Sequence, residues 1–118
     1  QHSGMLIPGP VQAAATVAFG DDVHVEEQRE RYRRRLELMA DVLSEWAGID
    51  VPGPAGAFYL WIPVADGWDF AERLATDGGA LVSPGEFYGA DGANFVRVAV
   101  VQPDERIDLV ARRLASTT

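Results

Sequence analysis

Residues 80–101 read ALVSPGEFYGADGANFVRVAVV, and this stretch decides the fold. Residues 95–101 form an apolar, β-branched run that is typical of a strand, and residues 80–83 form a shorter run of the same kind. The glycine-rich segment 84–94 between them is too short for a helical crossover, so we expect the two strands to pair antiparallel.

The segments outside this pair add helices and a third strand. Residues 57–64 are rich in aromatic and β-branched side chains, and Pro63 ends the run. Glycine and proline residues separate the rest of the chain into helical segments. The expected order is helices 11–19 and 23–47, a strand at 57–64, a helix ending near residue 76, strands 80–83 and 95–101, and a helix from residue 103.

Apolar residues recur at helical spacing along three of these helices. The long helix carries Tyr32, Leu36, Met39, Leu43 and Trp46, and Asp22 is its expected N-cap. The next helix is capped by Asp66 or Asp69 and places Trp68, Ala71, Leu74 and Ala75 on one side; the last one places Ile107, Val110, Ala111 and Leu114. We therefore predict an α/β fold of two layers (α+β), a small three-stranded sheet covered by helices.

The composition excludes several classes of function. The chain has 118 residues, enough for one domain, and its formal net charge of −8 argues against binding nucleic acids or anionic membranes. All ten basic residues are arginine, and cysteine and lysine are absent, which excludes disulfides and lysine-based catalysis. His2 and His24 lie far apart, so we expect no metal site. Since the chain begins with Gln1, we expect it to be a piece of a longer protein.

Arg97 is the first candidate functional residue. Strand alternation places Val96, Val98 and Val100 on one side, and Arg97 on the other side with Phe95. A guanidinium among apolar neighbours needs an anion or water. Two interpretations are open: Arg97 binds a substrate carboxylate, or it is structural, either on an edge strand reaching water or paired with Glu86 or Asp91.

Two aromatic segments and one basic segment allow alternatives of the same kind. The loop 83–89 and the run 56–61 carry aromatic side chains that either line a binding pocket or fill the core. The arginines of residues 29–35 resemble a nucleic-acid-binding helix, but acidic residues are interleaved with them. We favour a solvated helix face with salt bridges for that run.

Taken together, these segments resemble the C-terminal small domain of class I/II aminotransferases, the fold type I group that depends on pyridoxal phosphate. The loop at 84–89 is similar to the family's Pro-Gly-x-x-Phe-Gly motif, here with Tyr88 before the last glycine. Residues 95–99 resemble the strand whose arginine binds the substrate α-carboxylate. The matching pieces occur in the family's order: residues 2–14 leaving the large domain, then 56–61, 82–89, 95–99 and 103–106.

The resemblance implies roles for individual residues. Arg97 is expected to bind the α-carboxylate, and Ser3 to approach the cofactor phosphate of a neighbouring subunit. No catalytic residue is expected in this chain, because the family's cofactor lysine lies in the large domain. Pyridoxal 5'-phosphate is therefore expected in the intact enzyme but not covalently on this chain. Further substrate contacts are expected at Phe58, Tyr59, Pro84, Gly85, Phe87 and Tyr88.

The resemblance also implies partners and an activity. The sequences of residues 2–5, 27–32 and 84–89 are most similar to those of actinobacterial N-succinyldiaminopimelate aminotransferases, which act in lysine biosynthesis. We expect a single domain at 1–118, in which 1–20 leaves the large domain and 21–118 forms the core. Its expected partners are the N-terminal large domain of the same polypeptide, a second subunit in a homodimer, and amino acid and keto acid substrates, with glutamate as donor. We expect a cytoplasmic bacterial enzyme.

One competing hypothesis concerns a protein without catalysis. The same α/β pattern fits a ligand-sensing domain, or the aminotransferase-like half of a bacterial transcription regulator. The upstream sequence separates the hypotheses, since a Ser-x-x-Lys motif indicates a transaminase and a winged helix indicates a regulator. In either case we expect the isolated chain to be inactive.

Overall fold

The computed structural model describes residues 7–117, and it divides into two units, Gln1–Glu30 and Arg31–Thr118. The first unit contains α1 (Gly9–Phe19) and the beginning of α2 (Asp22–Ala47).

Asp21, and not Asp22 as expected, caps α2: its carboxylate accepts hydrogen bonds from the backbone N–H groups of Val23 and His24. The hydrogen bond from the His24 side chain lowers the pKa of the Asp21 carboxyl.

The second unit is built on a three-stranded antiparallel sheet with the order β1-β3-β2. The strands are β1 (Tyr59–Pro63), β2 (Ser83–Pro84) and β3 (Phe95–Ala99), so β3 is the central strand. The antiparallel pairing of the last two strands is confirmed. Their predicted lengths were too long, and residues 80–82 lie outside the sheet because β2 pairs with β3 only through Ser83 and Pro84.

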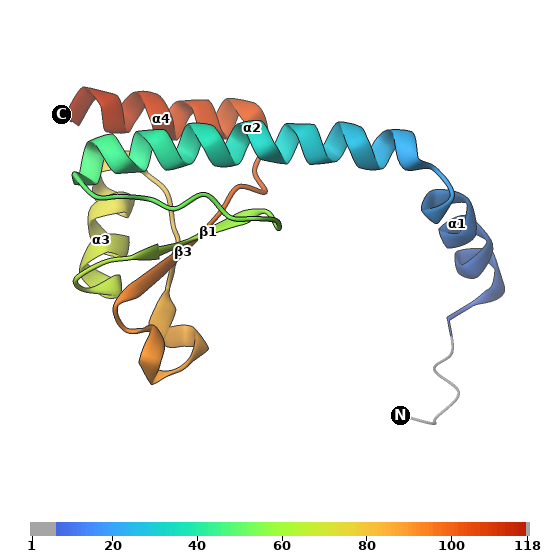
Figure 1. Ribbon diagram of the computed structural model, residues 1–118, viewed down its shortest axis with the longest axis horizontal. Coiled ribbons are helices and arrows are strands. Elements are labelled where there is room, and N and C mark those ends of the chain that lie inside the picture. The colour runs from blue at the N-terminus through green and yellow to red at the C-terminus, as the bar shows by residue number, and fades with distance from the viewer. Residues whose placement is uncertain (1–6, 118) are drawn as a thin grey trace. The chain divides into compact units, whose positions relative to one another are not determined.

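Helices cover one face of this sheet (Figure 1). The helices are α2, α3 (Gly67–Gly78) and α4 (Asp104–Thr117). The predicted alternation is confirmed, because Val96, Val98 and Val100 are buried on the helix side. They share one core with Leu36, Met39, Leu43, Val51, Leu60, Ile62, Phe70, Leu74, Ile107 and Leu114.

The α3 helix begins and ends as its sequence indicates, but its buried side is different from the predicted one. Asp66 is the N-cap and accepts hydrogen bonds from the backbone N–H groups of Trp68 and Asp69, and Gly79 ends the helix in the left-handed region with φ 69°. Phe70 and Leu74 face the core, whereas Trp68 is exposed. The predicted stripe was therefore wrong at Trp68.

Two short 3-10 helices connect β2 with β3: η1 (Gly85–Tyr88) and η2 (Ala90–Gly92). They pack closely on each other, because a Cβ at Gly85 would lie 2.8 Å from the carbonyl oxygen of Phe95 and closer still to that of Gly92. Only residues without a side chain fit at Gly85 and Gly92. This packing fixes the position of Tyr88 at the end of η1.

Arginines of the basic run at residues 29–35 of α2 form ion pairs, as the interleaved acidic residues predict. Arg29 pairs with Glu26 and Arg33 pairs with Glu37 on the exposed surface. Arg35 is different, because its side chain is only 12% exposed and its Nε lies 2.5 Å from Asp104 at the start of α4. This pair ties α2 to α4. Across residues 7–117, the structure contains no helix with the length and apolar character of a membrane span.

Candidate functional site

The face of the sheet that points away from the helices carries aromatic side chains around a single arginine. Tyr59 and Trp61 come from β1, Phe95 and Arg97 from β3, and Tyr88 from η1. We call the surface formed by these five residues the aromatic face. Alternation along β1 and β3 places the four strand residues there, since the intervening residues Leu60, Ile62, Val96 and Val98 are buried on the helix side.

Arg97 lies at the centre of the aromatic face. It is paired with Trp61 of β1 on one side and with Ser83 of β2 on the other, so it is not on an edge strand. Its guanidinium carbon lies 5.4 Å from the ring centroid of Tyr59 and 4.9 Å from that of Tyr88. Both distances are in the range of cation–π contacts.

The guanidinium of Arg97 has no polar partner among the described residues. Its Nε is buried and makes no hydrogen bond, and within residues 7–117 no carboxylate lies within 4.0 Å of the group. Glu86, one of the two acids proposed as a structural partner, instead accepts a 2.7 Å hydrogen bond from Nε1 of Trp68. A guanidinium without a carboxylate partner is available to bind an anion through its terminal nitrogens.

Further aromatic contacts surround the arginine. The ring of Trp61 stacks on Phe95, with centroids 5.2 Å apart and an interplanar angle of 13°, and it meets the ring of Tyr88 edge-on at 5.8 Å. Trp61 and Phe95 were not among the predicted site residues. The alternation of β1 and β3 was the signal that would have found them, because Trp61 is two residues from Tyr59 and Phe95 is two residues from Arg97.

The other predicted substrate-binding residues fall into two groups. Phe58 is near the site: its ring lies 5.8 Å from that of Tyr59, and its side chain is exposed. Phe87 packs edge-on against Trp68 of α3 at 5.3 Å. Pro84 and Gly85 are buried and hold the connection in place. Their contact with substrate stays a prediction.

Ser3, the predicted phosphate contact, lies outside the described residues. Within residues 7–117, no group of three or more His, Asp or Glu side chains is arranged to hold a metal ion. The chemistry that the aromatic face offers is recognition of an anion by one guanidinium, which contacts the rings of Tyr59 and Tyr88.

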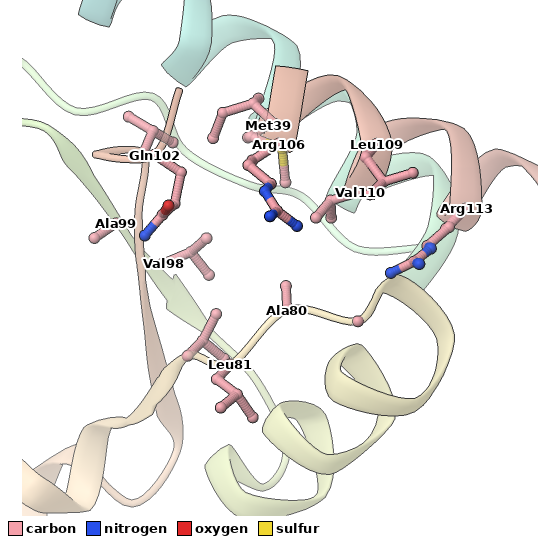
Figure 2. Close-up of a pocket in the computed structure, with 14 residues that line it drawn as sticks. Met39, Ala80, Leu81, Val98, Ala99, Gln102, Arg106, Leu109, Val110 and Arg113 are labelled. Carbon is pink, nitrogen blue, oxygen red and sulfur yellow. The ribbon is translucent and has the colours of Figure 1, made fainter. Parts of the chain in front are cut away.

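A separate cavity of about 430 Å³ opens on the helix side of the sheet, between α4 and residues 79–82 (Figure 2). Met39, Val98 and Val110 line it, and the guanidinium of Arg106 points into it (Figure 2). Arg113 lies over the end of α3, where its Nη1 donates to the carbonyl oxygen of Gly78 at 3.4 Å. None of the predicted site residues lines this cavity.

Comparison with known proteins identifies the family to which the chain is similar. The family model described as aminotransferase class I and II matches residues 1–114. The chain is 44% identical, over 97% of its length, to the 4-dedimethylamino-4-oxo-anhydrotetracycline transaminase OxyQ of Streptomyces rimosus, of which it covers 32%. It is 34% identical, over 90% of its length, to the LL-diaminopimelate aminotransferase of Oleidesulfovibrio alaskensis, of which it covers 28%.

A solved structure gives the same fold. The substrate-bound BacF structure from Bacillus subtilis matches 95% of this chain with a TM-score of 0.79 and 25% identity. The chain covers 30% of that structure. It therefore spans about a third of the length of the proteins that it matches.

Proposed function

Since the chain belongs to the class I and II aminotransferase family, we propose that it forms the wall of an aminotransferase active site that binds the substrate α-carboxylate. The observation that carries this proposal is Arg97, a guanidinium on the central strand with an unpaired Nε and, among residues 7–117, no carboxylate within 4.0 Å. A planar guanidinium matches a carboxylate with two parallel hydrogen bonds. The α-carboxylate is present in both the amino donor and the acceptor, so one arginine serves both half-reactions.

Residues 7–117 do not by themselves form a site for pyridoxal 5'-phosphate, on which the family generally depends. The chain has no lysine to bind the cofactor covalently, and the aromatic face offers one cation, whose surroundings are ring faces. We propose that the cofactor is held by the rest of the polypeptide, by the large domain and a second subunit of a homodimer. The role of this chain is to bind and orient the carboxylate and to exclude water around it.

For the substrate, we propose N-succinyldiaminopimelate and its keto acid, with glutamate as the amino donor, in lysine biosynthesis. The similarity to LL-diaminopimelate aminotransferase supports this choice of carbon skeleton. A second candidate is a polycyclic ketone, which the 44% identity to the anhydrotetracycline transaminase favours. Activity assays of the full-length protein with both acceptors separate them, since each candidate predicts turnover of one acceptor alone.

The experiment that tests the role of Arg97 is Arg97→Lys in the full-length protein. Lysine keeps the charge but loses the two-point geometry, so we expect kcat/KM to fall about 100-fold or more in both half-reactions. Arg112→Lys, on the exposed side of α4, is the matched control and should leave kcat/KM unchanged. Near-normal kinetics together with a lower melting temperature would show that Arg97 is structural and would contradict the proposal.

A further inference from the structure

The contacts of Arg97 differ from those of Arg33 and Arg35. Arg33 and Arg35 are held by carboxylates, at 2.5 Å from Glu37 and from Asp104. Arg97 has no such partner among residues 7–117, and instead it contacts the rings of Tyr59 and Tyr88. Its orientation is therefore set by two ring faces.

We propose that Tyr59 and Tyr88 are positioning residues of the carboxylate site, which hold the guanidinium of Arg97 between their rings and leave its terminal N–H groups free for the ligand. This proposal rests on the proposed role of Arg97. A ring face attracts a guanidinium without accepting its in-plane hydrogen bonds, whereas a protein carboxylate in the same place would occupy those donors. We call this arrangement the tyrosine clamp.

Separate parts of the fold supply the two rings of the tyrosine clamp. Tyr59 is fixed by the register of β1, in which Trp61 lies opposite Arg97 and Tyr59 lies opposite Ala99. Tyr88 is fixed by the η1 turn, whose Glu86 accepts the hydrogen bond from Trp68 of α3. Because each ring has its own support, the clamp is present in the domain before any substrate binds.

The burial of the Arg97 Nε adds a directional element. Nε is buried, so a ligand reaches the guanidinium at its terminal nitrogens. Rotation of the side chain about its last bonds would move those nitrogens away from the ligand, and the two rings oppose that rotation. Removal of a ring should therefore weaken binding of the carboxylate more than it slows the chemical step.

The first test uses substitutions in the full-length enzyme. Tyr59→Leu and Tyr88→Leu should each raise KM for the amino acid and the keto acid about tenfold, with a smaller effect on kcat, and Tyr59→Phe and Tyr88→Phe should recover most of the affinity. Equal KM values for the Leu and Phe variants would overturn the tyrosine clamp while the proposed function stands. If Arg97→Lys also leaves kcat/KM near normal, the proposed function is overturned.

The second test needs no substitution, which keeps the proposal falsifiable if the leucine variants do not fold. In NMR spectra of the 118-residue chain, side-chain protons of Arg97 should be shifted upfield by the two rings. Arg73, which lies 5.0 Å from the ring centroid of Trp46, is an internal reference in the same spectra, because its side-chain protons should also be shifted upfield. Arg97 signals at the positions of a solvated arginine would overturn the proposal.

Discussion

Replacement of Gly85 by alanine should destabilise the domain strongly, although Gly85 carries no side chain. The added methyl group would lie 2.8 Å from the carbonyl oxygen of Phe95, 3.0 Å from the Cβ of Phe95, and closer still to the carbonyl oxygen of Gly92. Two of these three neighbours are backbone atoms, which cannot rotate away. Overpacking of this kind costs about 1–3 kcal/mol or more.

The expected size of the effect follows from the length of the chain. For 118 residues, 1 kcal/mol lowers the melting temperature by about 4 °C, so Gly85→Ala should lower it by about 4–12 °C or more. The matched control is Gly53→Ala, because a Cβ at Gly53 meets nothing within 4 Å. That variant should be neutral or slightly more stable, because alanine restricts the unfolded chain. Thermal unfolding followed by circular dichroism measures both, and equal melting temperatures for the two variants would refute the reasoning.

Three other results follow from the structure. Asp66→Ala should lower the free energy of unfolding by about 1 kcal/mol, because it removes the N-cap of α3. Asp66→Asn, which keeps a capping oxygen, should retain most of that free energy. Equal losses for the two variants in urea titrations would argue against the cap. Arg35→Ala should lower the free energy of unfolding by about 1–2 kcal/mol, because it breaks the partly buried pair with Asp104. Arg29→Ala, at an exposed pair, should change it by less than about 0.5 kcal/mol. A larger loss for Arg29→Ala than for Arg35→Ala would contradict this account. The 118-residue chain mixed with pyridoxal phosphate, glutamate and a keto acid should show no transamination, since it has no lysine, and sustained turnover would disprove that expectation.

Much of the fold follows from local patterns in the sequence. The stripe from Leu36 to Leu43 and the alternation of Val96, Val98 and Val100 both predict the buried side, because burial of apolar surface dominates the packing of a small domain. The antiparallel pairing of β2 with β3 follows from the short connection between them. These features depend only on residues close together in the chain.

The errors come from contacts between distant segments. Trp68 has the spacing of a core residue, but its Nε1 donates to Glu86, eighteen positions along the chain, and its ring meets Phe87. Gly85 and Gly92 pack on each other, which no local pattern reveals. The tyrosine clamp likewise joins β1, η1 and β3, so only the folded chain brings Tyr59, Tyr88 and Arg97 together.

The most direct test of the central claim is a crystal structure of the full-length protein with a bound, unreactive analogue of an amino acid substrate. The account predicts that the α-carboxylate of the analogue lies within hydrogen-bonding distance, about 3 Å, of both terminal nitrogens of Arg97. It also predicts that the rings of Tyr59 and Tyr88 remain on either side of the guanidinium. An analogue whose carboxylate is held by other residues, with Arg97 contacting only the protein or solvent, would contradict the claim.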